Sequence, residues 1–472
     1  MDCWISIWAA LRTKWIGLAC GALIAAGLST TGTAESMRPA FPGAIGFGRN
    51  ATGWRGGEVV AITSLADAGP GTLRDCAENG DRPRICVFSL SGTIKLERPI
   101  RPGSNLYIAG QTAPGLGVQL RNGTSARSPI EIEEAHDIVL RFLKLRPGPS
   151  LEPSPVVDAL SIENGERLYF GNLSLMFATD ENFSLHVSGQ VSSDITLERS
   201  IVAYGLDRSS HPKGKHSKGA LICSKEGTDN QCGRVTLWGN LFAHNRDRNP
   251  DVNGTDIGPV EVVNNIFYNP ISQFGELYDH TGNLRFVYVG NVAAKGPSTT
   301  LRAAWALEAF EYVDAHDITI IARDNQVLRR ADCARNGQFS VLNPLARMKQ
   351  AEDPEAPESV AALPSSEVLA RIPLRVGDQI GGRRVSDPLD TLVLNSLAKC
   401  KGRIINSVEE VGGWPELAEL FQRDRDEDGM SDDWETGRPG LDPDRPNDPW
   451  AIDIQTGLPV IEAYLANLAG DI

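Results

Sequence analysis

Three short runs, Arg234-Val-Thr-Leu237, Pro259-Val-Glu-Val262 and Asn283-Leu-Arg-Phe286, alternate polar and apolar residues. Each run is followed by an asparagine, namely Asn240, Asn265 and Asn291. Such alternation predicts β-strands. When similar coils stack, asparagine amides at equivalent turns can bond the coil above and the coil below. This stretch therefore predicts stacked β-coils joined by an asparagine ladder.

The same pattern extends outward over residues 40–330. Further runs are Asn105-Leu-Tyr-Ile108, Asp137-Ile-Val-Leu140, Arg167-Leu-Tyr-Phe170, Asp194-Ile-Thr-Leu197 and Asp317-Ile-Thr-Ile320, and further asparagines are Asn172 and Asn325. The runs recur about every 25 to 40 residues, a period typical of stacked-coil folds. No helical pattern separates them, which excludes βαβ units. The periodicity favours an all-β parallel β-helix.

The charge of the chain limits the classes of binding partner that we expect. The formal net charge is −14, and no basic run occurs, so a nucleic-acid partner is not expected. An acidic protein repels a polyanionic sugar. To bind one, it needs a local Arg/Lys cluster or a bridging cation.

Residues 1–34 have the features of a signal peptide. Arg12 and Lys14 precede an apolar stretch from Trp15 to Leu28, and Gly32-Thr33-Ala34 forms a small-residue cleavage site. The apolar stretch is short for a membrane span. We expect a secreted or periplasmic protein without a stable membrane anchor; an uncleaved N-terminal anchor is the alternative.

The cysteines agree with export. Six remain after the leader is removed, an even number that suits an oxidising compartment. Cys76 with Cys86 and Cys223 with Cys232 are locally spaced pairs, which leaves Cys333 with Cys400. Their spacings do not match the usual zinc patterns. Reduced structural cysteines are the alternative.

The character of the chain changes after residue 330. We expect an irregular, helical covering segment over 331–410, with an exposed excursion at 344–368 that is rich in Pro and Glu. A C-terminal segment then spans 411–472. Helices are predicted near 388–400, 415–423 and 458–468.

A calcium-loop pattern lies in the C-terminal segment. Positions 1, 3, 5, 6, 9 and 12 of the pattern are filled by Asp424, Asp426, Asp428, Gly429, Asp432 and Glu435. Three short carboxylates at alternate positions can converge on one ion, and Glu435 can reach back to it. A structural Ca²⁺ site is predicted here; a solvated acidic run is the alternative.

Several motifs occur in an order that resembles the bacterial and fungal branch of the pectate lyase family over residues 40–325. They are Phe41-Pro-Gly-Ala-Ile-Gly-Phe-Gly48, Ser64-Leu-Ala-Asp-Ala-Gly-Pro-Gly-Thr-Leu-Arg-Asp75, Ser91-Gly-Thr-Ile94, Ile108-Ala-Gly-Gln-Thr-Ala-Pro-Gly115, Arg141-Phe-Leu-Lys-Leu-Arg-Pro-Gly148, Asn240-Leu-Phe-Ala-His-Asn-Arg-Asp-Arg-Asn-Pro250 and Val263-Asn-Asn-Ile-Phe-Tyr-Asn269. Val411-Gly-Gly-Trp-Pro415 extends the resemblance toward the C-terminus. It implies a right-handed parallel β-helix over 35–330.

The resemblance also implies a chemistry: Ca²⁺-dependent β-elimination on polygalacturonate or a related uronan. Arg248 matches the arginine of the family's Arg-x-Pro element and is the candidate base, which requires neighbouring cations and burial to lower its pKa. Lys218 is the candidate that holds the substrate carboxylate, with Lys213 and Lys215 as competitors. Arg246 is a further candidate for substrate binding.

The resemblance places a second calcium site within the coils. Asp158, Asp180 and Glu181 fit it by position, because carboxylates from adjacent coils can converge on one Ca²⁺. We expect a monomer whose partner is an acidic polysaccharide.

Four positions depart from the family pattern: Gly171-Asn172, Trp238-Gly239-Asn240, Asp251 and Val156. They keep open a non-catalytic protein that binds acidic polysaccharide on the same fold. A β-helix hydrolase is a third hypothesis, but it needs a pair of acids at the glycosidic bond. The Arg-x-Pro element argues against it.

Overall fold

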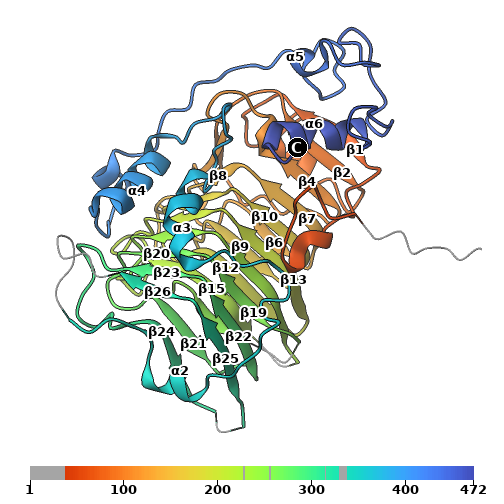
Figure 1. Cartoon of the computed structure of the whole chain (residues 1–472). Coiled ribbons are helices and arrows are strands. Elements are labelled where there is room, and N and C mark those ends of the chain that lie inside the picture. The colour runs from red at the N-terminus through yellow and green to blue at the C-terminus, as the bar shows by residue number, and fades with distance from the viewer. Residues whose placement is uncertain (1–37, 227–228, 255–256, 314, 329–336) are drawn as a thin grey trace, which may run out of the picture. The chain divides into compact units, whose positions relative to one another are not determined.

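The stacked coils of the chain contribute strands to three sheets (Figure 1). A computed structural model describes residues 38–472 apart from 227–228, 255–256, 314 and 329–336. The largest sheet has ten strands in the order β1-β2-β4-β7-β10-β13-β16-β19-β22-β25. They are β1 (Glu58–Ile62), β2 (Arg84–Phe88), β4 (Leu106–Ala109), β7 (His136–Arg141), β10 (Glu166–Gly171), β13 (Val191–Glu198), β16 (Gln231–Trp238), β19 (Val260–Val263), β22 (Leu284–Val289) and β25 (Ile318–Arg323).

The other two sheets have nine and eight strands. The nine-stranded sheet contains β3 (Gly92–Leu96), β5 (Val118–Asn122), β8 (Leu143–Leu145), β11 (Ser174–Met176), β14 (Ile201–Ala203), β17 (Leu241–Ala243), β20 (Ile266–Tyr268), β23 (Val292–Ala294) and β26 (Gln326–Leu328). The eight-stranded sheet contains β6 (Glu131–Glu133), β9 (Leu160–Glu163), β12 (Glu181–Ser188), β15 (Lys218–Glu226), β18 (Asp251–Asn253), β21 (Gly275–Tyr278), β24 (Trp305–Phe310) and β27 (Ser340–Leu342). Neighbouring strands pair in parallel, so the predicted parallel β-helix is confirmed.

All eight runs predicted from alternation fall on the ten-stranded sheet, from β4 to β25. The other two sheets were not predicted, because many of their strands have only three residues and leave no pattern to detect. The last strand, β27, lies beyond the expected boundary at residue 330. Residues 38–472 form one compact unit.

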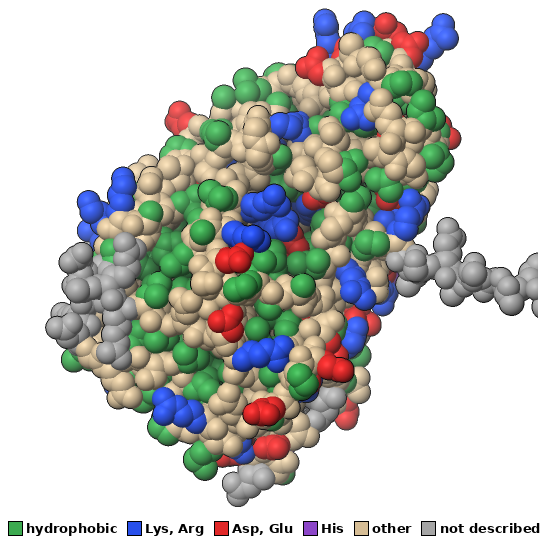
Figure 2. Space-filling model, in the orientation of Figure 1, with side chains coloured by type: hydrophobic (Ala, Val, Ile, Leu, Met, Phe, Trp, Pro, Cys, Tyr) green, Lys and Arg blue, Asp and Glu red, His purple; other side chains and the backbone are tan. Residues whose placement is uncertain are grey.

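The surface carries both signs of charge. On the face in Figure 2, Lys and Arg side chains are interspersed with Asp and Glu side chains among hydrophobic and other residues. Charge recognition therefore depends on local clusters, which are described below.

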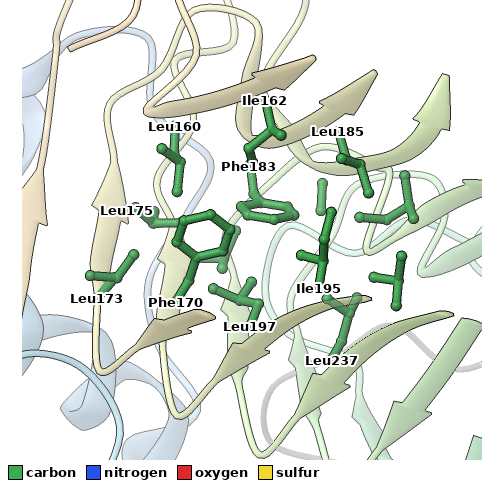
Figure 3. Close-up of a cluster of buried hydrophobic side chains, with 14 of the residues drawn as sticks. Leu160, Ile162, Phe170, Leu173, Leu175, Phe183, Leu185, Ile195, Leu197 and Leu237 are labelled. Atoms are coloured by element: carbon green, nitrogen blue, oxygen red, sulfur yellow. The ribbon is translucent and has the colours of Figure 1, made fainter. Parts of the chain in front are cut away.

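Side chains from all three sheets meet inside the coils (Figure 3). Phe170 of β10, Leu175 of β11 and Phe183 of β12 are fully buried in one hydrophobic cluster. The rings of Phe170 and Phe183 pack edge to face with centroids 5.9 Å apart. Phe170 and Leu197 are register partners on neighbouring strands, so each coil repeats the same inward position. Burial of such a side chain stabilises the fold by about 1.5–3 kcal/mol.

The asparagine ladder is confirmed. The side-chain amide of Asn240 donates to Asn265 (2.9 Å), that of Asn265 donates to Asn291 (3.2 Å), and that of Asn291 donates to Asn325 (3.1 Å). Each side-chain oxygen also accepts the backbone N–H of the preceding ladder residue, as in Asn240 N to Asn265 (2.9 Å). Buried turns thus satisfy their polar groups from coil to coil.

Asn172 does not belong to the ladder, which corrects its prediction. Its amide donates to the carbonyls of Arg375 (2.7 Å) and Gly377 (3.2 Å) in the covering segment. By strand register it is equivalent to Asn264, one position before the ladder. Both residues have left-handed backbone, with φ of 55° and 56°. An asparagine suits either position, so residue type alone could not separate them.

Two of the three helices predicted after residue 330 are present. They are α4 (Pro388–Lys399) and α6 (Val460–Ala469). The helix predicted at 415–423 is wrong: this stretch is extended and pairs with residues 89–91, with Ser91 N donating to Leu420 O (3.0 Å) and Gln422 N to Ser89 O (2.8 Å). The other helices are α1 (Leu73–Ala77), α2 (Pro344–Met348), α3 (Ser365–Arg371) and α5 (Asp432–Glu435), with 3-10 turns η1 (Phe47–Asn50), η2 (Gly110–Thr112), η3 (Ile372–Leu374) and η4 (Val408–Val411).

Buried ion pairs attach the covering segment to the coils. Arg146, just beyond β8, contacts Asp387 (2.6 Å) and Asp390 (2.9 Å) at the start of α4, and all three side chains are at most 1% exposed. The stretch 344–368 is largely exposed, as predicted, but a few of its residues pack against the coils. Ala356 and Val360 are buried in a cluster with Trp238 of the ten-stranded sheet.

Two predicted disulfides are present, Cys76–Cys86 and Cys223–Cys232. Cys400 is disulfide-bonded, but Cys333 lies outside the described residues, so that pairing stays a prediction. The predicted signal peptide, residues 1–34, also lies outside them. No helix in the described part of the chain combines the length and apolarity needed to cross a bilayer.

Candidate functional site

A groove of about 710 Å³ crosses the eight-stranded sheet. Its lining residues come from successive strands, β6 to β21, so it runs in the direction in which the coils stack. The acidic side chains that line it are Glu131, Glu133, Asp158, Glu163, Asp180, Glu181 and Asp251, and the basic ones are Arg127, Lys213 and Arg248. The groove is therefore acidic, and it contains all three carboxylates of the calcium site predicted within the coils.

Those carboxylates do converge. Asp158, Asp180 and Glu181 each bring one oxygen to within 4.8 Å of the others. Asp158 accepts hydrogen bonds from Ser184 Oγ (2.5 Å) and Glu181 N (3.0 Å), which fixes its orientation. Burial, and then the charge of Glu181, raises the pKa of Asp158; burial, and then Asp180, raises the pKa of Glu181 to about 7. Mutually repelling buried carboxylates fit Ca²⁺, which prefers oxygen ligands.

Two histidines missed by the sequence interpretation close one side of this cluster. The rings of His211 and His216 stack with centroids 3.8 Å apart, and His216 Nε2 lies 2.5 Å from an Asp180 oxygen. His211 Nδ1 accepts the Lys213 N–H (3.1 Å), so its proton is on Nε2, the atom that faces Asp180. Burial lowers the pKa of both histidines to about 4. His211 is thus neutral, and its Nε2 lies 3.8 Å from Asp180, beyond hydrogen-bond distance. Asp180, His211 and His216 also lie close enough together to hold a metal ion.

Arg248 faces the same cluster. Its Nη1 donates to Glu181, and its Nε lies 3.5 Å from Asp251. Its backbone N–H donates to Glu276 Oε1 (3.1 Å). Burial opposes the charge of Arg248, but Glu181 and Asp251 outweigh it and raise its pKa. The expected lowering of the Arg248 pKa by neighbouring cations is therefore absent, because its neighbours are carboxylates.

The other predicted basic residues lie in different surroundings. Lys218 Nζ pairs with Asp247 (2.5 Å) and lies outside the set that lines the groove. Arg246 pairs with Asp207 (2.6 Å) and lines a second hollow of about 630 Å³. Lys213 is exposed and lines the groove, whereas Lys215 is exposed outside its lining set. Lys213 is thus better placed than Lys218 to meet a substrate carboxylate.

The C-terminal loop forms a second carboxylate cluster. Oxygens of Asp424, Asp426 and Asp428 lie within 4.8 Å of one another, and Glu435 is fully buried. Asp424 Oδ1, Asp426 Oδ2 and Glu435 Oε2 are buried without a hydrogen-bond partner in the described part of the chain. Burial, and then Asp428, raises the pKa of Glu435 to about 8. Orphaned carboxylate oxygens at positions 1, 3 and 12 fit a Ca²⁺ ion.

Asp432, at position 9, has a different role in this structure. Its carboxylate accepts Arg425 N (2.9 Å) and Arg425 Nε (2.7 Å). It therefore shapes the loop through Arg425.

Comparison with known proteins agrees with the geometry. A probable pectate lyase C of Emericella nidulans is 30% identical over 441 residues, which cover 91% of this chain and 92% of that protein. The chain belongs to the pectate lyase family. The match to a probable pectate lyase C of Aspergillus fumigatus is 37% identical but spans only 56% of that protein. No protein-family model matches. The cedar pollen allergen Jun a 1 shares the fold, with a TM-score of 0.51 at 17% identity over 71% of this chain and 92% of that chain.

The positions that depart from the pectate lyase pattern divide into two groups. Gly171 and Trp238 end β10 and β16 on the ten-stranded sheet, away from the strands that form the groove. Asp251 and Val156 line the groove. Burial, and then Glu276, raises the pKa of Asp251 to about 8. Only the second group lies where it could contact a molecule bound in the groove.

Proposed function

We propose that this pectate lyase family member cleaves pectate or a related uronan by Ca²⁺-dependent β-elimination in the groove. The observation that carries this proposal is the contact of Arg248 with Glu181, one of three converging buried carboxylates. An arginine beside a carboxylate cation site is the pairing that proton abstraction next to a uronate carboxylate requires.

The residues take the following roles in the proposal. Asp158, Asp180 and Glu181 hold the ion, with Asp180 oriented by its histidines. Ca²⁺ held there would neutralise the uronate carboxylate, and its positive charge would lower the pKa of the nearby Arg248. Neutral Arg248 then takes the C5 proton, the electron pair forms the C4–C5 double bond, and the glycosidic oxygen leaves C4 and takes a proton from water. Lys213 contacts a substrate carboxylate from the groove wall; Lys218 and Arg246 stay predictions.

Arg248→Lys tests this assignment. The substitution keeps the charge but loses the planar fork, and removal of a general base costs about a hundred- to ten-thousand-fold in rate. We expect release of unsaturated uronate, followed by ultraviolet absorbance, to fall by that order with the melting temperature retained. Arg234→Lys is the matched control, because Arg234 pairs with Asp194 (2.6 Å) outside the groove. Equal activity of Arg248→Lys and wild type would remove Arg248 from the role.

A second candidate function is binding without cleavage. Its supporting observation is Asp251, which lies 3.5 Å from Arg248 and helps to raise the pKa of that guanidinium, an effect that opposes a role as base. A wild-type protein that binds polygalacturonate but yields no unsaturated product from any uronan would favour it.

We also propose export and a structural role for the second ion. The two disulfides and the expected leader support a secreted or periplasmic protein. Ca²⁺ in the loop of Asp424 would hold the C-terminal segment 411–472 against the coils. The monomeric state stays a prediction.

A further inference from the structure

Four aromatic rings form a stack at one end of the groove, here named the aromatic platform: Tyr278, His280, Phe310 and Tyr312. Tyr278 stacks on Phe310 with centroids 5.0 Å apart and 13° between planes, and the two are register partners on β21 and β24. His280 stacks on Tyr312 at 4.6 Å. Tyr278 also stacks on His280 (5.4 Å) and on Tyr312 (5.9 Å).

The platform is exposed and yet held in place. Tyr312 is 62% exposed, and His280 is also exposed. Asp279, which is fully buried, accepts the backbone N–H groups of Tyr312 (2.8 Å) and Val313 (3.0 Å). A buried carboxylate thus fixes the backbone that presents the outermost ring. Rigid exposed aromatic rings are typical of binding surfaces, because they offer contact area at low entropic cost.

The platform continues the candidate site. Tyr278 and His280 line the groove together with Arg248. The Glu276 carboxylate links the two, since it accepts Arg248 N (3.1 Å) and the Tyr278 hydroxyl (2.9 Å). Adjacent strands are about 4.8 Å apart, which is comparable to the length of one sugar unit. A polysaccharide that crosses the candidate base therefore reaches the platform within one or two units.

Buried acidic side chains lie next to the platform. Asp251, Glu276 and Glu308 are register neighbours on β18, β21 and β24, and all three are buried. One oxygen of Glu308 has no hydrogen-bond partner among the described residues. Burial raises the pKa of Glu308 to about 7 and that of Asp251 to about 8, so these acids already resist negative charge and a free uronate placed beside them would meet the same resistance. A sugar whose acid group is esterified avoids this repulsion and keeps the apolar ring face that stacks on aromatic side chains.

We infer that the aromatic platform is a binding subsite for a methyl-esterified uronate unit of the same chain whose free uronate unit occupies the Asp158 cluster. The inference rests on the proposed function, which places the free uronate unit at the Asp158 cluster. The preferred polymer is then partly esterified, with a free acid at the bond that breaks and an ester near the platform.

The test compares wild type with Tyr312→Ala and Tyr312→Phe. Tyr312 is exposed, so truncation leaves the core intact, and Tyr312→Phe keeps the ring as a control. Binding is measured by retardation in native gels that contain either polygalacturonate or highly methyl-esterified pectin, and cleavage is measured in parallel. We expect Tyr312→Ala to weaken binding of esterified pectin by about five- to twenty-fold, to leave polygalacturonate binding unchanged, and Tyr312→Phe to behave as wild type.

The outcomes separate the two proposals. Selective loss of pectin binding in Tyr312→Ala supports the platform, even if wild type releases no unsaturated product and the proposed cleavage fails. Three outcomes overturn the platform: Tyr312→Ala binds esterified pectin as wild type does, it loses both polymers equally, or wild type does not bind esterified pectin. Normal cleavage of polygalacturonate alongside any of these would leave the proposed function standing.

Discussion

His244 is a buried histidine whose neutral form the fold requires. Its Nε2 donates to Ser396 Oγ of α4 (2.6 Å), and its Nδ1 accepts from the Asn269 amide (2.9 Å). Its ring stacks on Tyr204 with centroids 4.8 Å apart. Burial lowers the pKa of His244 to about 3, whereas an unfolded histidine has a pKa of about 6.5.

This shift predicts a loss of stability in acid. Below a pH of about 6.5 the unfolded state binds a proton that the native state excludes, so stability falls as the pH falls toward about 3. His244→Gln removes the proton site and keeps polar ends. Within that window, its free energy of unfolding relative to wild type should change by about 1.4 kcal/mol per pH unit. Urea unfolding at several pH values measures this. Parallel curves would mean that native His244 takes up the proton.

Sequence reasoning found single residues where a motif names them and missed residues that only the path of the chain brings together. The convergence of Asp158 with Asp180 and Glu181 was predicted from adjacent coils. His211 and His216 follow β14 in an irregular loop, and no local pattern indicated that they would turn toward Asp180. Asp251 was noticed as a departure, but its effect on Arg248 required the geometry of the ion pair.

At the scale of the element, the asparagine ladder makes a sharp stability prediction. Asn265→Ala removes the acceptor of Asn240 N and the donor to Leu237 O (2.8 Å), all in the buried interior. Leaving buried polar groups unpaired costs about 1–3 kcal/mol each, so we expect a loss of about 3–5 kcal/mol in urea unfolding. Asn325→Ala at the half-buried end of the ladder should cost clearly less. Equal losses at the two positions would argue against a cooperative ladder.

If the C-terminal loop binds Ca²⁺, the order of melting temperatures of Asp426→Asn and wild type should reverse between chelator and Ca²⁺. Asp426→Asn removes one charge and keeps the shape of the side chain. In chelator, the variant should melt above wild type, because it relieves repulsion with Asp424 and Asp428. In Ca²⁺, it should melt below wild type, which gains about 2.7 kcal/mol at a hundred-fold excess over Kd. Asp433→Ala, on the exposed side of α5, is the control. If the chelator leaves the melting temperature of wild type unchanged, the loop is not a Ca²⁺ site.

Elements were predictable where their pattern was long. Eight strands of the ten-stranded sheet, β4 to β25, were found because alternation persists over four or more residues. The helix at 415–423 was wrong because Pro415 and its neighbours instead extend and pair with Ser91, a tertiary contact that a local pattern does not contain. The loop at 424–435 was found because its ligands are fixed by spacing within one short stretch.

At the scale of the molecule, the negative charge of the protein restricts how it can bind an acidic polysaccharide. The chain has a formal net charge of −14, and acidic side chains outnumber Lys and Arg side chains in the lining of its groove. A polyanion therefore binds only with a cation between the two partners or with part of its charge masked. The carboxylate cluster beside Arg248 provides a place for the cation. The aromatic platform, one or two sugar units away, provides a place for a unit whose charge is masked.

The central claim is that the groove cleaves a uronan by elimination. The most direct measurement is mass spectrometry of the oligosaccharides that the wild-type protein releases from polygalacturonate, with Ca²⁺ and with a chelator. We expect products that appear only with Ca²⁺. Each product with a new non-reducing end should be lighter by one water than the corresponding hydrolysis product. Products of full hydrolytic mass, or bound polymer that stays uncut with Ca²⁺ present, would contradict it.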